Sequence, residues 1–419
     1  MLNVIFDASV VTNIFYKDWA RSGIFFAAKN ILDEILKRED VKVTLYFSPE
    51  NFADGARLIK EYYPGVATLQ EMSRLSFLQT LYCKLRFYYS RFYDHRHFRK
   101  IFALLMEFIN SVFRRLVLID EASVNRNDVF FSPVFVIPDF IRRTPEINTF
   151  VFLYDFIQLR FPQYYPEGVP LVKRIIESSN SKDRFFFDSL SAKNDGKYFF
   201  STITDENSVV VHLAANKNFK RILDSQILDR VKKKYKIPSK KKYLFSLCTV
   251  EPRKNLIRSV RCFLEFISKH NINDLVWVMG GGHWDYFINE LKKNNVRWNP
   301  NFIIQAGYID DEDLPVLYSN AEWFVYTSQY EGFGLPPLEA MQCGCPVITS
   351  NNSSLPEVVG NAGMMIDWDS DDQHIEAYEK YYFDENLRKE FSRKGLERAK
   401  LFSWEKTADE IVDVMKAGV

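Results

Sequence analysis

The sequence lacks the features that would mark a secreted, membrane-spanning or nucleic-acid-binding protein. Its five cysteines are an odd number without the spacing of zinc ligands, which suits a reducing compartment. The formal net charge is only +1, so no overall field attracts nucleic acid. No apolar run approaches the ~18 residues of a membrane-spanning helix, and the first one already ends at Asp7, too short for a signal peptide. These absences predict a cytoplasmic protein with no nucleic-acid partner.

The first part of the chain has the pattern of a β-α-β unit. Leu2 to Phe6 and Val41 to Phe47 are short apolar runs that predict buried strands. The helix predicted between them follows Gly23 and carries its apolar residues on one face, namely Ile24, Ala28, Ile31, Leu32, Ile35 and Leu36. Lys197 to Thr204 and Ser208 to Leu213 are predicted as the last strands of this domain. The layout is that of a doubly wound sheet.

A second α/β unit is predicted in the other half of the chain, because 419 residues are enough for two cores. The basic run from Val231 to Lys242, broken by Pro238, is interpreted as a solvated connector. Further strands are predicted at Tyr243–Leu247, Leu275–Met279, Phe302–Ala306, Trp323–Tyr326, Val347–Thr349 and Met364–Ile366. We therefore expect an N-terminal domain of residues 1–230, a C-terminal domain of residues 231–400 and a terminal helix in residues 401–419.

A glycine-bearing loop joins the strand at Trp323–Tyr326 to a helix that begins behind Pro336, a residue favoured at helix starts. Gly332 and Gly334 let the backbone of this loop approach a ligand closely. The N–H groups at the N-terminus of the helix can then bind an anion such as a pyrophosphate. The loop therefore predicts a site for a phosphorylated ligand.

Charged side chains surround this loop. Glu331 and Glu339 flank it with seven residues between them. Glu331 is placed to contact a bound sugar, and Glu339, about one turn inside the helix, can accept hydrogen bonds from a vicinal diol. Arg253 and Lys254 follow another predicted strand and offer a diphosphate a guanidinium fork and a point charge. Together these residue types predict a site for a ligand that carries a diphosphate and a diol.

Glu331 to Glu339 resembles the E-x7-E motif of retaining, nucleotide-sugar-dependent glycosyltransferases of the GT-B fold. The likeness is to the family 4-like branch of mannosyltransferases and bacterial surface-polysaccharide enzymes. It implies an α/β protein with two Rossmann-like, doubly wound domains that face each other across a cleft, and a last helix that returns to the first domain. It implies a GDP- or UDP-linked donor, such as a mannose-like one, and a surface-glycan or lipid-linked acceptor. No metal or other cofactor is expected.

The resemblance also implies roles for individual residues. The catalytic residues would be Glu331, Asp155, Lys254 and Arg253. The donor-binding residues would be Gly23, Thr249, Tyr308, Gly332, Phe333, Gly334, Leu335 and Glu339. One position departs from the family, whose segment usually reads His-Asp where this chain has Tyr154 and Asp155. A tyrosine can donate a hydrogen bond but carries no charge near neutral pH, so the role of the histidine is not carried over.

Some interpretations stay open at this point. The aspartates in Asp310–Asp313 and Asp367–Asp369 resemble metal ligands, but helices are predicted close behind both stretches, which favours capping. A nucleotide-sugar epimerase of similar architecture is an alternative function, and a non-catalytic subunit that binds sugar nucleotides is another. The intact pair of Glu331 and Glu339 argues against the non-catalytic alternative.

Residues 77–115 differ in character from the rest of the chain. Phe77, Leu81, Leu85, Tyr88 and Phe92 recur at helical spacing among basic residues, which are Lys84, Arg86, Arg91, Arg96, Arg99, Lys100, Arg114 and Arg115. One interpretation is a surface that contacts an anionic bilayer on the inner face of the cytoplasmic membrane, with Tyr82, Tyr88, Tyr89 and Tyr93 at the headgroups. The other is a helical pair with a buried aromatic stripe and a solvated basic face.

Overall fold

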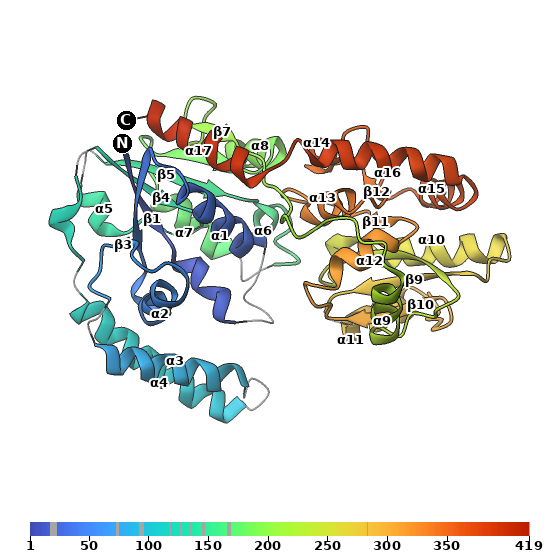
Figure 1. The fold of residues 1–419 in the computed structure, drawn as a ribbon, viewed down its shortest axis with the longest axis horizontal. Helices are drawn as coiled ribbons and strands as arrows, with labels where there is room; N and C mark the ends of the chain where they lie inside the picture. Colours follow the sequence, from blue (N-terminus) through green and yellow to red (C-terminus); the bar gives the residue numbers. More distant parts are fainter. Residues whose placement is uncertain are drawn as a thin grey trace.

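The protein folds into two α/β units that lie side by side in the computed structural model (Figure 1). Each unit contains one parallel sheet covered by helices, which confirms the predicted fold class. The structure describes residues 1–16, 23–72, 75–91, 96–117, 119–125, 127–134, 136–144, 147–165, 169–282 and 284–418.

The first sheet has seven strands, and every neighbouring pair in it is parallel. Its order is β3 (Ala67–Thr68), β2 (Val41–Tyr46), β1 (Leu2–Asp7), β4 (Asp128–Ser132), β5 (Asn148–Leu153), β6 (Arg184–Phe187) and β7 (Ser208–Val210). The central strands are almost wholly apolar because both faces are covered. In β6, for example, Phe186 belongs to one hydrophobic core, while Phe185 and Phe187 belong to the core on the opposite face.

The second sheet has six strands and repeats the same order of connection. It runs β10 (Ile303–Gly307), β9 (Leu275–Gly280), β8 (Lys242–Leu247), β11 (Phe324–Tyr326), β12 (Val347–Ser350) and β13 (Met364–Ile366). In both sheets the chain reverses its direction of winding beside the first strand. Ligands of doubly wound proteins bind at this point, outside the carboxyl ends of the strands.

Helices connect the strands and cover both sheets. Those of the first unit are α1 (Gly23–Ile35), α2 (Phe52–Tyr62), α3 (Ser76–Arg91), α4 (Arg96–Leu116), α5 (Asp139–Arg143), α6 (Ile157–Arg160), α7 (Val169–Glu177) and α8 (Leu190–Phe199), with short 3-10 helices at Ser9–Phe15, Pro49–Asn51 and Glu121–Ser123. The second unit has α9 (Ser225–Lys234), α10 (Leu256–Lys269), α11 (Trp284–Lys293), α12 (Leu314–Asn320), α13 (Leu335–Gln342), α14 (Leu355–Val359), α15 (Asp371–Phe383) and α16 (Glu385–Ala399), and a 3-10 helix at Pro252–Lys254.

The last helix, α17 (Trp404–Ala417), packs against α1 of the first unit, so the chain crosses back at its end. Thr407 Oγ1 donates a hydrogen bond to the carbonyl oxygen of His212, at 2.7 Å. The two chain ends lie close together in Figure 1. The packing of α17 therefore joins the far end of the chain to the first sheet.

Two local predictions were wrong. The strand predicted from Lys197 to Thr204 is instead the end of α8 followed by a turn, and Ser208–Val210 alone forms the last strand of the sheet. Of the basic run from Val231 to Lys242, predicted as a connector, Val231–Lys234 is instead the last turn of α9, and only the residues between α9 and β8 connect two elements. Asp313 fixes this helix to the second unit, because it is ion-paired with Lys234 and accepts a hydrogen bond from the Tyr235 hydroxyl at 2.9 Å.

Helices α3 and α4 form a hairpin that packs on α2 and extends away from the sheet (Figure 1). Its inner face holds Tyr82 and Phe113, which are buried against Phe52. Arg86 is also turned inward, where it is ion-paired with buried Asp54. Tyr82 and Arg86 therefore do not belong to an exposed basic surface. Among the described residues, no helix is both long and apolar enough to cross a bilayer.

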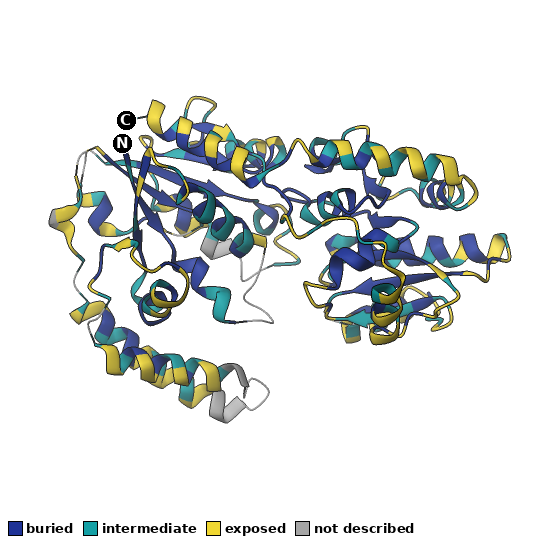
Figure 2. Ribbon diagram, in the orientation of Figure 1, coloured by how far each residue is buried: buried dark blue, intermediate teal, exposed yellow. Residues whose placement is uncertain are grey.

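The outer face of this hairpin is exposed (Figure 2), and many of its side chains are apolar. The side chains on it are Phe77, Leu81, Phe87, Tyr88, Ile101, Leu104, Leu105 and Phe108. On α4 the exposed residues recur at steps of three and four, the spacing of one helical face. The hairpin thus has a second apolar face besides the one that it buries.

Candidate active site between the two sheets

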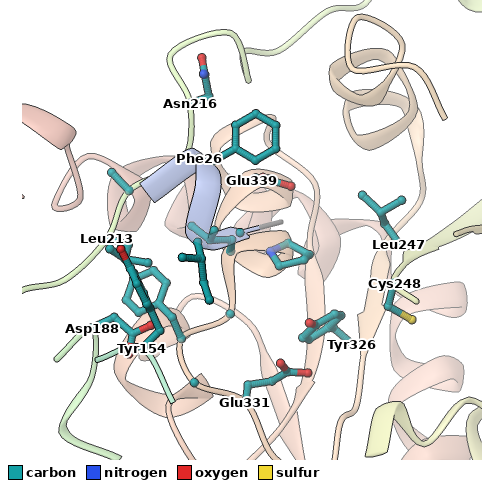
Figure 3. A pocket seen from close by; sticks show the side chains of 18 of the residues that line it. Phe26, Tyr154, Asp188, Leu213, Asn216, Leu247, Cys248, Tyr326, Glu331 and Glu339 are labelled. Carbon is teal, nitrogen blue, oxygen red and sulfur yellow. The ribbon is translucent and has the colours of Figure 1, made fainter. Parts of the chain in front are cut away.

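A cavity of about 750 Å³ lies between the two units and is lined by residues of both. Its size is within the range of about 300–1,000 Å³ that small-molecule sites occupy. Of the residues predicted for the site, those that line it are Gly23, Asp155, Thr249, Arg253, Lys254, Glu331, Gly332, Phe333, Gly334, Leu335 and Glu339. Tyr308 does not line it, and its side chain is exposed. Figure 3 shows several of the lining side chains.

The loop between β11 and α13 touches the first unit so closely that only glycine fits at position 332. A Cβ atom there would lie 2.8 Å from the Cβ of Asp155 and 2.9 Å from the carbonyl oxygen of Tyr154. The φ of Gly334 is +112°, a conformation that favours glycine. The Ser354 hydroxyl holds the loop through the carbonyl oxygens of Glu331 and Phe333, at 3.1 and 2.7 Å. The loop is therefore fixed before any ligand arrives.

The N-terminus of α13 lies at the cavity, but it offers few backbone donors. Pro336 and Pro337 occupy the first turn and have no N–H group. Gly334 and Leu335 carry N–H groups at this end and line the cavity. A phosphate bound here would thus depend on these two backbone groups and on side chains from elsewhere.

The side chains nearest to this loop form a buried ionic cluster. Lys254 Nζ lies 2.7 Å from Glu331 Oε1, and Arg253 Nη1 lies 2.9 Å from Glu331 Oε2. Burial alone would raise the pKa of Glu331, but the two cations lower it to about 2. The glutamate is therefore ionised throughout the physiological range. The two basic residues and the glutamate predicted from the sequence meet at one point.

Arg253 and Lys254 differ in how many of their hydrogen-bond donors already have a partner in the protein. Arg253 is ion-paired with Glu251, donates to the Tyr330 carbonyl oxygen and donates from Nε to the Tyr165 hydroxyl at 3.2 Å. Lys254 uses its Nζ on Glu331 and on the Tyr326 hydroxyl, at 2.7 and 2.6 Å, and an ammonium has three donors. Arg253 thus organises the protein around the loop, whereas Lys254 retains a donor for a ligand.

Glu339 faces the cavity from α13 and has a different electrostatic environment. The Tyr318 hydroxyl donates to its Oε2 at 3.1 Å. Burial raises the pKa of Glu339 to about 7, despite that hydrogen bond. Its carboxyl group therefore exchanges its proton near neutral pH, and a ligand that donates hydrogen bonds to it favours the ionised form.

The wall formed by the first unit contains Tyr154 and Asp155, which directly follow β5. Asp155 accepts a hydrogen bond from the backbone N–H of Ile157 at 3.0 Å, and burial raises its pKa. The Tyr154 ring stacks on Phe152 with 4.7 Å between the ring centres. Tyr154 therefore occupies the family's histidine position with a neutral ring that the strand below supports.

Sequence reasoning missed several residues of the cavity. Asp188 directly follows β6 and lines the cavity, as do Phe26 and Asn30 from α1 and Asn216 from the segment after β7. For Asp188 a signal was present, because it follows the apolar run Phe185–Phe187, and the carboxyl ends of parallel strands share one edge. The others depend on how the two units face each other.

The aspartate stretches that resemble metal ligands have structural partners. Asp367 accepts a hydrogen bond from the Gln373 side chain at 2.8 Å, and Ser370 caps α15 through the Gln373 N–H. In the part of the chain that the structure describes, no group of three or more potential metal-ligating side chains comes together.

Residues 229–398 match the family model described as "Glycosyl transferases group 1". Over 291 residues the chain is 31% identical to O-antigen chain mannosyltransferase B of Escherichia coli, which covers 69% of this chain and 74% of that protein. The chain belongs to the group 1 glycosyltransferases. Mannosylfructose-phosphate synthase of Agrobacterium fabrum is 33% identical over 115 residues, which is 26% of this glycosyltransferase and 25% of that protein.

Solved structures share the fold of this glycosyltransferase. The Anabaena protein HepE in complex with UDP and glucose aligns with a TM-score of 0.64 at 13% identity, over 100% of both chains. WaaG, a glycosyltransferase involved in lipopolysaccharide biosynthesis, aligns with a TM-score of 0.61 at 13% identity, over 99% of each chain. At such identities the likeness concerns the fold alone, and it confirms the GT-B arrangement of two Rossmann-like units.

Removal of one member of the buried ionic cluster should destabilise the glycosyltransferase strongly. Glu331→Ala leaves Arg253 and Lys254 buried without their shared carboxylate, so we expect a loss of about 3 kcal/mol in the free energy of unfolding in urea. Because the pKa of Glu331 is lowered in the folded state, this contribution is present above pH 4.5 and declines as the pH falls towards 2. The control is Glu121→Ala, which breaks an exposed pair with Arg143. Equal losses in the two variants would contradict the prediction.

Proposed function

We propose that the enzyme is a retaining glycosyltransferase that transfers a hexose from a GDP- or UDP-linked donor, such as a mannose-like one, to a hydroxyl group. The acceptor would be a growing surface glycan or a lipid-linked sugar. The observation that carries the proposal is the convergence of Lys254, Glu331 and Glu339 on one cavity between two Rossmann-like units. The relative from Escherichia coli, an O-antigen chain mannosyltransferase, supports the choice of sugar and acceptor.

The donor's nucleotide would lie on the second unit. Glu339 would accept hydrogen bonds from the ribose hydroxyls, and the diphosphate would lie between Lys254 and the N–H groups of Gly334 and Leu335. These groups would stabilise the negative charge that develops on the diphosphate as it leaves. Glu331, held between two cations, would position the sugar. No metal ion would then be needed for this step.

The reaction breaks the bond between the sugar's anomeric carbon and the diphosphate oxygen, which keeps the electron pair. A new bond forms between that carbon and the acceptor oxygen, whose proton is released. Positive charge develops on the sugar in between, and Glu331 would face it with an ionised carboxylate, because its pKa is far below neutral. Retention of configuration would require the acceptor to enter on the face that the diphosphate leaves.

A donor panel tests this function directly. Purified protein is mixed with UDP-glucose, GDP-mannose and a dTDP-sugar, each with and without a mannose-terminated lipid-linked glycan, and the released nucleoside diphosphate is measured. We expect release from one donor that accelerates with the acceptor and continues in excess EDTA. Activity lost in EDTA and restored by magnesium or manganese would overturn metal independence. Isomerisation of the donor without acceptor would instead indicate an epimerase.

Glu339 provides a pH test of the ribose site. The ionised carboxylate is the form that accepts two hydrogen bonds, and its pKa is about 7, so donor affinity should rise about tenfold between pH 6 and pH 8. The rise is measured by calorimetry with an intact sugar nucleotide, because the terminal phosphate of a free diphosphate titrates near 6. Glu339→Ala should weaken binding by about 1–3 kcal/mol and remove the pH dependence. Tyr318→Phe should move the rise to higher pH. Unchanged affinity in Glu339→Ala would remove the residue from the ribose site.

We also propose that the α3–α4 hairpin contacts an anionic membrane surface, which would bring the enzyme to a lipid-linked acceptor. The exposed fractions of Phe77, Leu104 and Phe108 are 77%, 72% and 68%, a large apolar surface for one hairpin. Lys84, Lys100 and Arg115 are exposed on the same two helices. Each basic side chain near an anionic surface contributes about 1 kcal/mol, so apolar contact and charge would act together.

Vesicle co-sedimentation tests this contact. The protein should sediment with anionic vesicles and much less with neutral ones. Binding should be lost in Phe77→Ser/Leu104→Ser/Phe108→Ser and reduced in Lys84→Glu/Lys100→Glu/Arg115→Glu. The matched control Lys389→Glu/Lys400→Glu/Lys406→Glu changes the charge equally on α16, on the turn after it and on α17. Equal recovery in the supernatant with both vesicle types would refute the contact, and concentration-dependent dimerisation lost in the serine variant would assign this face to a second copy of the chain.

A further inference from the structure

Two buried polar groups on the first unit's side of the cavity have no hydrogen-bond partner among the described residues. They are the Oδ1 atom of Asp188 and the hydroxyl of Tyr154. The two side chains are 2% and 7% exposed, and both line the cavity. Figure 3 shows the two side by side on the wall opposite Leu247 and Cys248. Most buried polar groups in proteins are paired, so this exception requires an explanation.

The sheet itself places the two groups together. Leu153 at the end of β5 lies beside Phe187 at the end of β6 in parallel register, so the residues that follow, Tyr154 and Asp188, leave the sheet next to each other. Both therefore stand at the carboxyl edge of the sheet, where ligands of such folds bind. Their position is set by strand pairing, which is rigid, and not by a loop.

Among the described residues, no partner reaches the Oδ1 atom of Asp188, although hydrogen bonds from its own backbone and from Ser189 act on the carboxyl group and lower its pKa. The charged groups that act on it are Asp155 beside β5 and Glu357 on α14, and both are acidic. Glu357 is itself occupied, because it accepts hydrogen bonds from the backbone N–H groups of Leu190 and Ser191 at 2.7 and 3.0 Å. Burial and these two neighbours raise the pKa of Asp188 well above its usual range. A neutral carboxyl group can both donate and accept a hydrogen bond, as a tyrosine hydroxyl can.

We propose that Asp188 and Tyr154 together bind one hydroxyl group of a sugar and set the enzyme's selectivity for that hydroxyl. A sugar hydroxyl also donates one hydrogen bond and accepts others, so it matches both orphan groups at once. A sugar that lacks the hydroxyl would leave two buried polar groups unpaired, and sites of this kind reject such analogues strongly. The inference rests on the proposed transferase function and deepens it. The sugar is that of the donor or that of the acceptor, and the experiment separates the two.

The test compares Asp188→Leu, Asp188→Asn and Tyr154→Phe with the natural enzyme. Asp188→Leu should lower turnover of the accepted donor, UDP-glucose or GDP-mannose, by about tenfold or more, because one partner of the hydroxyl is lost. Asp188→Asn keeps a donor and an acceptor and should retain most of the turnover. Affinity for free UDP and GDP should be unchanged in all three variants. A fall of donor hydrolysis without acceptor assigns the hydroxyl to the donor sugar. A fall confined to transfer onto methyl mannoside assigns it to the acceptor.

Thermal stability distinguishes this role from a structural one. Loss of an unsatisfied buried group does not destabilise a protein, so the melting temperature of Asp188→Leu and Tyr154→Phe should stay equal or rise. The matched control is Asp128→Asn, which removes a buried carboxylate at the opposite end of the same sheet that accepts from Asn3 and from the backbone N–H of Asn125. That control should melt lower and turn over normally. A melting temperature of Asp188→Leu several degrees below the natural one, or unchanged turnover in it, would overturn the proposal. Failure of the natural enzyme to bind UDP or GDP would count against the proposed function instead.

Discussion

The site depends on one interaction, the double ion pair that buried Glu331 forms with Lys254 and Arg253. A charge removed from water is stable only when it is paired, and this one is paired twice, with Lys254 and Arg253. The two cations follow β8 and the glutamate follows β11, which are neighbours in the second sheet. The ionic cluster therefore ties together the two turns at the point where the direction of winding reverses. It fixes the turn after β8 relative to the glycine-bearing loop after β11.

The same cluster extends into the first unit through polar contacts. Arg253 donates to Tyr165, and Tyr330 beside the glutamate donates to Asp195 of α8 at 2.6 Å. Farther along, Glu357 accepts hydrogen bonds from the first N–H groups of α8. Contacts of this kind between units are polar and can exchange with water more readily than an apolar core. The two walls of the cavity are thus aligned by hydrogen bonds, while each wall is made rigid by its own sheet.

The hairpin of α3 and α4 places aromatic and basic residues both on a buried inner face and on an exposed outer face. Its sequence alternates aromatic, apolar and basic residues. The buried aromatic stripe is confirmed on the inner face, whereas contact of the outer face with an anionic membrane stays a prediction. Arg86 and Tyr82 are inside, where a buried aspartate and the core require them, whereas Phe108 and Lys100 are outside. Helical periodicity predicts which residues share a face, but it does not predict which element packs against that face. The structure shows that α2 packs against the hairpin and covers its inner face.

The sequence alone determined the two doubly wound units, because buried parallel strands such as β9 and β12 are short apolar runs between recognisable turns. It also determined most of one wall of the site, since Glu331, Gly332, Gly334 and Glu339 lie within a few residues of each other and act through local chain geometry. The structure decided what depends on distant segments. It showed α8 where a strand was expected, because its amphipathic pattern is weak, and it placed Lys234 on Asp313 of the second unit. It brought Asp188 beside Tyr154 through strand pairing across 34 positions of sequence. The burial, the partners and the pKa of a side chain depend on contacts between residues that are distant in the sequence. Only the tertiary structure therefore decided which acidic groups are paired and which have no partner.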